Sequence, residues 1–304
     1  MAVLAPPSPV DDTSALVNLS TRLRWYRHGR HDPTTRIGPT GMVRAVLTED
    51  GPATIAMSWA SGSLEVESWG PGADRAAHGA RGMAALERRP APLPDLHPVV
   101  TAAARRLPGL WAGASGDLYH ALLPAIVAQR ITSGEAIRQW SRLCRELGER
   151  APGPDLGLVL PPHPDQLVGR PAWWFHPLGI EAKRARALTE VARVARRLWD
   201  WARLPASEVA AKLGLIRGVG PWTVGSALGP ACADDDAVAV GDYHLPSIVC
   251  WNLAGEPRGT DDRMLALLEP FRGQRGRVVR LLVHAGRTPP AFGPRRRILP
   301  MHRW

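Results

Sequence analysis

Apolar residues recur at three- and four-residue spacing through most of residues 97–290. The spacing is clear in DLYHALLPAIVAQRI, SGEAIRQWSRLCREL and EAKRARALTEVARVARRLWDWA, and Gly and Pro stand between these runs. A period near 3.6 residues with Gly or Pro at its ends is typical of amphipathic helices. The pattern therefore predicts an all-helical domain of about nine short helices over residues 97–290.

Residues 21–95 follow a different pattern. MVRAVLTED, ATIAMSW and GSLEVESW partly alternate between apolar and polar residues, and EDGP and WGPGAD punctuate them. Alternation bounded by Gly, Pro and Asp predicts a small antiparallel sheet, here with one helix. The expected fold class is mainly α, preceded by a small antiparallel α+β domain. Residues 1–20, rich in Pro and Ser, are expected to be disordered, and residues 291–304 form a basic C-terminal tail.

The charge of the chain favours a polyanionic partner. Its formal net charge is +10, and because Lys183 and Lys212 are the only lysines, nearly all the positive charge is arginine. Such a balance favours nucleic acid first and an acidic membrane surface second. Cys144, Cys232 and Cys250 form no CxxC pair, so reduced thiols in a cytoplasmic protein are expected. No secretory signal or membrane span is predicted.

The stretch LGLIRGVGPWTVGSAL, residues 213–228, places two glycines between helix-like runs. A dinucleotide or Walker phosphate loop is excluded, because a helix rather than a strand precedes the glycines and no GK[ST] follows. A plain turn remains open, with Gly218 ending one helix and Pro221 beginning the next. A helix–hairpin–helix explains the second glycine as well, because bare amides and a helix N-terminus can approach a phosphate closely.

Asp242 lies twenty residues after Trp222, just before another helical run. Alone, Asp242 is most simply a helix N-cap. Together with the hairpin, it resembles the helix–hairpin–helix–Gly/Pro–Asp superfamily of DNA glycosylases. RRLPGLW, LLPAIVAQRITSGEAI and PLGIEAKRARALTEVA also resemble stretches of the AlkA-type 3-methyladenine DNA glycosylases, as does the strand-rich region before them.

The resemblance implies a chemistry for this segment. Asp242 stands at the catalytic position of the superfamily, where a carboxylate stabilises positive charge on the sugar as the glycosidic bond breaks. Bifunctional members carry a lysine where this chain has Trp222, so a monofunctional enzyme is expected. The aromatic residues expected to line the pocket for a flipped, alkylated base are Trp222, Tyr243, Trp251, Trp173 and Trp174, and core packing is the alternative role for each.

The remaining expectations concern DNA contacts and the surroundings of the pocket. Hairpin contacts to the DNA backbone are expected from Gly218, Val219, Gly220, Pro221 and Thr223. The expected wedge residues are Gln129 and Arg130, and the expected phosphate contacts are Arg272, Arg275 and Arg277, together with Arg295 to Arg297 in the tail. Gly225 and Ser226 lack the bulky aromatic of some AlkA-type enzymes, and Ala285 stands where an aromatic is expected, which suggests a wider pocket or one tuned to a different alkylated base. Asp234 to Asp236 are expected to form a solvated loop.

The sequence thus predicts a monomeric DNA repair enzyme acting on double-stranded DNA with damaged bases. The predicted reaction is hydrolysis of the N-glycosidic bond of alkylated purines, of the 3-methyladenine and 7-methylguanine class, which leaves an abasic site. A glycosylase of the same fold for another damaged base, or an inactive protein that binds DNA damage, remains open. No cofactor or metal site is predicted, although the hairpin carbonyls could bind a monovalent cation.

Overall fold

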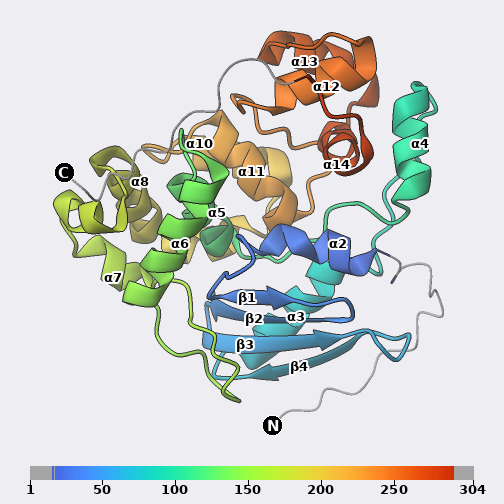
Figure 1. The fold of residues 1–304 in the computed structure, drawn as a ribbon. Coiled ribbons are helices and arrows are strands. Elements are labelled where there is room, and N and C mark those ends of the chain that lie inside the picture. The colour runs from blue at the N-terminus through green and yellow to red at the C-terminus, as the bar shows by residue number, and fades with distance from the viewer. Residues whose placement is uncertain (1–15, 17, 291–304) are drawn as a thin grey trace.

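The N-terminal part of the chain folds into one antiparallel sheet with a helix against it (Figure 1). The computed structural model describes residue 16 and residues 18–290. The sheet order is β1-β2-β3-β4, and the first elements are α2 (Leu19–Leu23), η1 (Arg24–Tyr26), β1 (Thr35–Ile37), β2 (Gly41–Thr48), β3 (Gly51–Ser58), β4 (Glu65–Trp69) and α3 (Ala73–Ala84). Strands β2, β3 and β4 cover the three predicted segments, whereas the short β1 is additional to them. The single predicted helix corresponds to α3, and the short α2 is a further helix.

The rest of the described chain is helical, as predicted. Its elements are α4 (Pro98–Arg106), α5 (Leu118–Val127), α6 (Ser133–Leu147), α7 (Pro164–Val168), η2 (Ala172–Leu178), α8 (Ala182–Arg193), α9 (Ala195–Trp201), α10 (Ala206–Gly214), α11 (Pro221–Cys232), α12 (Leu245–Ala254), α13 (Asp261–Leu268), η3 (Glu269–Phe271) and α14 (Arg275–Ala285). These eleven α-helices exceed the predicted nine, partly because the run from residue 181 to residue 202 breaks at Val194. The mainly α fold class with a small α+β region is confirmed.

Two boundary predictions fall at the chain ends. The segment predicted to be disordered extends to residue 20, but Leu19 is fully buried against the sheet, so the prediction is wrong for the start of α2. Residues 1–15 and the basic tail at 291–304 lie outside the described residues, and so do Arg295 to Arg297.

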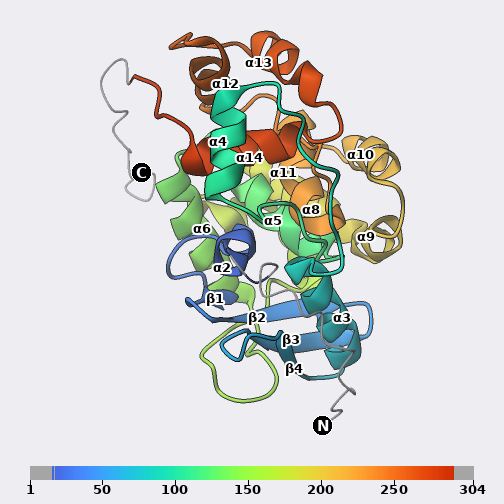
Figure 2. The ribbon, with the colours of Figure 1, turned by 90° about the vertical axis from the view of Figure 1, so that its right-hand side faces the viewer.

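Three large hydrophobic cores and a small fourth one, formed by Ala103, Leu110 and Leu281, hold the described chain together. One lies between the sheet, α2 and α3, and a second is formed by α5, α6 and α8 to α11. Strand β2 contributes to both cores, because successive side chains of a strand point to opposite faces of the sheet. Met42 and Val46 pack into the first core, and Ala45 and Leu47 pack into the second. The third core lies between α4, α12, α13 and α14, where α4 runs beside α14 (Figure 2). The segment between α11 and α12 therefore connects the second core to the third.

The acidic run after α11 differs from its prediction. Asp235 is only 4% exposed and pairs with Arg88 at 2.7 Å and with Arg280. It also accepts a hydrogen bond from the backbone N–H of Ala112 at 2.8 Å. The prediction of a solvated loop is therefore wrong for Asp235, because long-range contacts from three parts of the chain enclose it.

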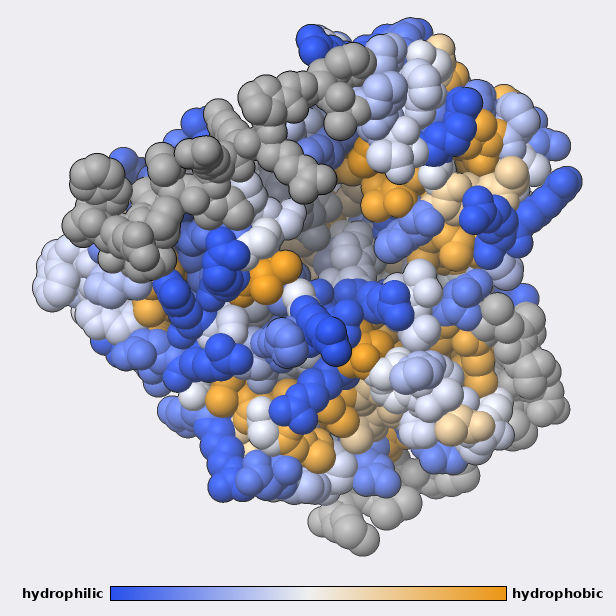
Figure 3. Space-filling view, in the orientation of Figure 1, coloured by the Kyte–Doolittle hydropathy of each residue, from blue (hydrophilic) through white to orange (hydrophobic). Residues whose placement is uncertain are grey.

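The face drawn in Figure 3 carries both hydrophilic and hydrophobic residues. It is hollowed where the α12–α14 region meets the rest of the molecule. Among the described residues, no helix is both long enough and apolar enough to span a membrane.

Candidate active site

The structure constrains the two hairpin glycines differently. Gly218 has φ +90°, and a Cβ there would lie 2.6 Å from Cβ of Ala187 on α8. Its left-handed backbone and close approach to α8 both exclude a side chain. Gly220 has φ −101°, a value any residue adopts, and a Cβ there would meet no atom within 4 Å. No contact within the described chain requires Gly220, which leaves its backbone open to an outside partner.

The other hairpin residues anchor the loop to the body of the protein. Val219 is buried in the second core, and Pro221 occupies the first turn of α11, where its missing N–H costs nothing. Gln129 Nε2 donates hydrogen bonds to the carbonyl oxygen of Gly218 and to Oγ1 of buried Thr223, both at 2.9 Å. Gln129 therefore ties the segment after α5 to both sides of the hairpin.

Arg130, the second predicted wedge residue, follows directly and is exposed. Its φ is +58°, an uncommon conformation for a residue with a Cβ, so the backbone presents this side chain on a tight turn. The wedge role of Gln129 and Arg130 stays a prediction, and for Gln129 it competes with the two hydrogen bonds that hold the hairpin.

Asp242 and Trp222 lie together. Asp242 Oδ2 accepts a hydrogen bond from the indole Nε1–H of Trp222 at 2.9 Å. Its Oδ1 accepts hydrogen bonds from the backbone N–H groups of His244 at 2.8 Å and Leu245 at 3.0 Å, at the start of α12. Three N–H donors thus hold the half-buried carboxylate and compensate its charge. Its orientation depends on α11 and α12 together.

Gly225 has a role that the sequence analysis missed. A Cβ at this position in α11 would lie 2.3 Å from the carbonyl oxygen of Val238 and 2.8 Å from Cα of Ala239. The expectation of a wider pocket at Gly225 is wrong, because the backbone leading to Asp242 occupies that space. No spacing rule reveals this contact, since it joins a helix to an irregular segment.

A second missed residue is Asp261 at the start of α13. Its Oδ1 accepts a hydrogen bond from the backbone N–H of Gly241 at 3.0 Å, next to Asp242. The turn that carries Asp242 is therefore fastened to α13 as well as to α11.

The other predicted pocket residues are dispersed. Tyr243 is 89% exposed, with its ring edge-on to His244. Trp251 is half-buried on α12 and lies beneath the guanidinium of Arg287, 5.5 Å from its ring centre.

Trp173 and Trp174 lie on η2, which packs against α6 and α8 rather than against α12. Trp173 is 68% exposed, while half-buried Trp174 packs on Phe175 and beneath Arg170. Within the described residues, no hydrogen bond or ring contact joins either tryptophan to Asp242. Of the predicted pocket residues, the structure brings Trp222 into contact with the carboxylate.

The arginines predicted to contact phosphate have partners within the chain. Arg272 donates to Glu269 at 2.8 Å, and Arg275 donates through Nε to Asp236 at 2.9 Å. Arg277 donates to the carbonyl oxygen of Leu110 at 3.1 Å. Their role at DNA stays a prediction, and it would require these side chains to exchange or share their present partners.

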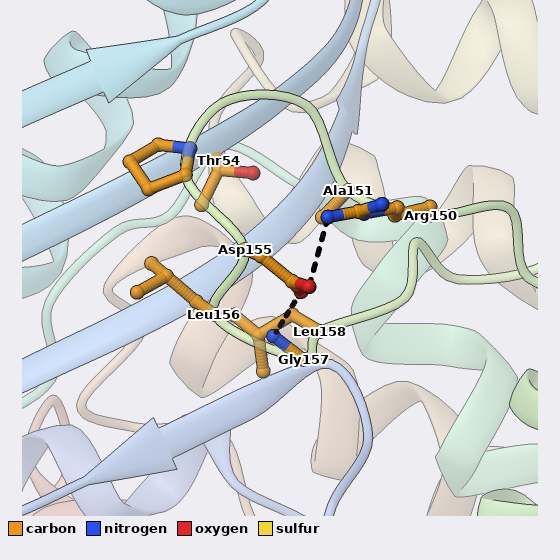
Figure 4. Close-up of a pocket in the computed structure, with 8 residues that line it drawn as sticks. Thr54, Arg150, Ala151, Asp155, Leu156, Gly157 and Leu158 are labelled. Carbon is orange, nitrogen blue, oxygen red and sulfur yellow. Dashed lines mark hydrogen bonds and ion pairs between the residues drawn. The ribbon is translucent and has the colours of Figure 1, made fainter.

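Two cavities of the described chain lie away from Asp242. A shallow recess beside Thr54 and Leu158 has no room for a water molecule, and Asp155 lies across it, 2.9 Å from Arg150 (Figure 4). A larger cavity of about 340 Å³ lies where the sheet and α3 meet the helical core. Among the described residues, no cluster of His, Cys, Asp or Glu side chains is arranged to hold a metal ion. Cation binding by the hairpin carbonyls stays a prediction.

Comparisons with known proteins identify the fold. No family model matches the sequence, and the search of curated proteins found no match. A solved structure of "3-methyladenine dna-glycosylase from Archaeoglobus fulgidus" is similar over 88% of this chain and 95% of its own, with a TM-score of 0.72 and 14% identity.

Two further solved structures agree. An 8-oxoguanine glycosylase/lyase of Clostridium acetobutylicum matches with a TM-score of 0.59 and 12% identity over 83% of this chain and 98% of its own. The 3-methyladenine DNA glycosylase Mag1 of Schizosaccharomyces pombe, in complex with abasic DNA, matches with a TM-score of 0.52 and 17% identity over 62% and 91%. The chain thus has the fold of these DNA glycosylases.

Proposed function

We propose that this protein is a monofunctional DNA glycosylase that removes alkylated purines, of the 3-methyladenine and 7-methylguanine class, from double-stranded DNA. The observation that carries the proposal is the hydrogen bond from Trp222 to Asp242, directly behind a glycine hairpin. It places an aromatic ring and a fixed carboxylate next to each other, as removal of a flipped base requires.

The reaction assigned to this site is a hydrolysis. As the C1′–N bond breaks, its electron pair leaves with the base, and positive charge develops on the sugar. Asp242 stabilises that charge, and water supplies the oxygen of the new C1′–O bond while its proton passes to the carboxylate or to solvent. Alkylation at purine N3 or N7 already makes the base a good leaving group, so no acid need protonate it.

The lysines support the monofunctional part of the proposal. A lyase of this type needs a lysine amine at the sugar, where it forms a Schiff base. Lys212 directs Nζ toward the ring of Trp201, 5.8 Å from its centre, and Lys183 is exposed on α8. Among the described residues, neither lysine forms a hydrogen bond or ion pair with Trp222 or Asp242.

Binding to duplex DNA rests on charge and on the hairpin. The net charge of +10 attracts a polyanion, and the unobstructed backbone at Gly220 allows a phosphate to approach the start of α11. Such a contact positions the enzyme without reading sequence. A monomer suffices for these contacts, and a cytoplasmic location fits the reduced thiols expected of its cysteines.

The test is release of free base from duplex DNA that carries 7-methylguanine or 3-methyladenine. We expect base release without strand cleavage, with breaks appearing only after alkali. Strand cleavage without alkali would contradict the monofunctional assignment, and binding without release would favour the damage-binding alternative. Duplexes with 8-oxoguanine test the second candidate, which the fold of the Clostridium acetobutylicum enzyme motivates.

A further inference from the structure

Side-chain packing restrains the turn that carries Asp242 only weakly. Gly241 has φ +93°, in the left-handed region that favours glycine, and a Cβ there would meet one atom of the described chain within 4 Å, Cβ of Trp222 at 3.9 Å. On the other side of Asp242, Tyr243 is 89% exposed. A glycine with so few neighbours can adopt other backbone conformations. The hydrogen bonds of the turn therefore determine where Asp242 lies.

Two backbone N–H groups of the turn have acceptors in different places. The N–H of Asp242 donates to the carbonyl oxygen of Ala239 at 3.2 Å, within the turn itself. The N–H of Gly241 donates to Oδ1 of Asp261 at 3.0 Å, twenty residues further along the chain. Among the hydrogen bonds of the described chain, this is the one that ties the backbone of residues 240–242 to another helix.

The helix that begins at Asp261 is itself fixed against α12. Helices α12 and α13 lie side by side (Figure 1), and Met264 of α13 is buried with Val249 of α12 in the third core. Arg263 Nε donates to both carboxylate oxygens of Glu256, at 3.2 and 3.1 Å, and so fastens the start of α13 to the loop after α12. The first turn of α13 is therefore a rigid support from which Asp261 reaches Gly241.

Asp261 also has an ordinary structural role, which its neighbour shares. Asp261 and Asp262 are both acidic residues in the first turn of α13, where a carboxylate interacts favourably with the helix dipole. Asp262 is exposed and forms no hydrogen bond or ion pair with another described residue. Because only Asp261 accepts the N–H of Gly241, the two residues separate support of the helix from support of the turn.

We propose that Asp261 is a positioning residue of the candidate active site. It accepts the hydrogen bond from Gly241 and thereby fixes the backbone from which the carboxylate of Asp242 faces the sugar. Asp261 acts through Gly241 and does not touch the reacting atoms. The role needs an acceptor oxygen rather than a negative charge, so an asparagine at this position can perform it. This inference rests on the proposed function, because Asp242 carries the reaction.

The test is single-turnover release of 7-methylguanine from duplex DNA by the full chain and three variants. Asp261→Ala should slow release about tenfold at unchanged DNA affinity, because small displacements of a catalytic group are costly. Asp261→Asn keeps the acceptor oxygen and should release base at nearly the wild-type rate. Asp262→Ala loses the same interaction with the helix dipole and should also match the wild type. Equal rates in Asp261→Ala and Asp262→Ala, or equally slow release by Asp261→Asn and Asp261→Ala, would overturn the proposal.

Amide hydrogen exchange in the free protein separates this inference from the proposed function. The N–H of Gly241 should exchange faster in Asp261→Ala than in the wild type, because it loses its acceptor, and should stay protected in Asp261→Asn and Asp262→Ala. If the wild type releases no base from alkylated DNA while exchange changes in this way, the proposed function fails and the support of the turn by Asp261 is confirmed. Equal exchange of Gly241 in all four proteins would overturn the inference, whether or not the wild type is active.

Discussion

At the scale of single residues, the indole N–H of Trp222 positions the carboxylate of Asp242. Trp222→Phe keeps an aromatic ring and removes the 2.9 Å hydrogen bond to Oδ2. Because a hydrogen bond to a charged group contributes about 1.5–3 kcal/mol, base excision should slow by about tenfold to a hundredfold. Single-turnover rates measure this, with Trp201→Phe as the control. DNA affinity should not change, whereas the melting temperature should fall, because the same hydrogen bond is lost from the folded protein. An unchanged excision rate would show that the contact does not position the carboxylate.

The two hairpin glycines give opposite predictions. In Gly220→Ala the new methyl group meets no atom of the chain within 4 Å and the backbone needs no unusual φ, so the melting temperature should be unchanged. DNA affinity should fall about fivefold or more, because the methyl group obstructs the approach of a phosphate. Gly218→Ala combines φ +90° with a clash at Ala187, and it should destabilise the fold by about 2 kcal/mol or more. Thermal melts and fluorescence anisotropy separate the two. Wild-type DNA affinity in Gly220→Ala would exclude the proposed phosphate contact.

At the scale of helices, the packing of α11 against the segment before α12 determines where Asp242 lies. In Gly225→Ala the new Cβ would press on the backbone of Val238 and Ala239, which cannot yield like the end of a flexible side chain. Asp242 follows directly, and its N–H is bonded to the carbonyl oxygen of Ala239. We expect excision to slow by at least about tenfold, because small displacements of a catalytic group are costly.

Gly214→Ala on α10 is the matched control for this change. A Cβ there would meet nothing within 4 Å, so the variant should be as stable as the wild type or more stable, since alanine favours helices by up to about 1 kcal/mol. If Gly225→Ala had the melting temperature and the excision rate of Gly214→Ala, the packing of residues 238–239 would not determine the position of Asp242.

Helices, strands and the hairpin could be predicted from the sequence because they depend on local periodicity and on Gly and Pro. The sequence assigns Trp222 and Asp242 to one site, but the hydrogen bond between them could not be predicted, because it depends on how the two side chains are oriented in the folded chain. The bridging role of Gln129 and the packing at Gly225 could not be predicted, because both arise where segments far apart in the chain meet.

At the scale of the whole molecule, buried Asp235 joins regions distant in sequence. It pairs with Arg88, which follows α3, and with Arg280 of α14. Asp235→Asn would leave both arginines without their counter-charge and should destabilise the protein by about 3 kcal/mol or more. Urea unfolding measures the loss. Asp234→Asn is the control, because Asp234 accepts a backbone N–H bond from Asp236 that an asparagine can keep. Equal stability of the two variants would contradict the structural role of Asp235.

The measurement that tests the account most directly is single-turnover base release from duplex DNA containing 7-methylguanine, by the wild type and by Asp242→Asn. The variant preserves shape and removes the negative charge, so release should slow by about a hundredfold or more while DNA affinity is retained. Asp262→Asn, at an exposed neighbouring carboxylate, should match the wild type. Release by Asp242→Asn at the wild-type rate would contradict the assignment of Asp242 as the catalytic carboxylate.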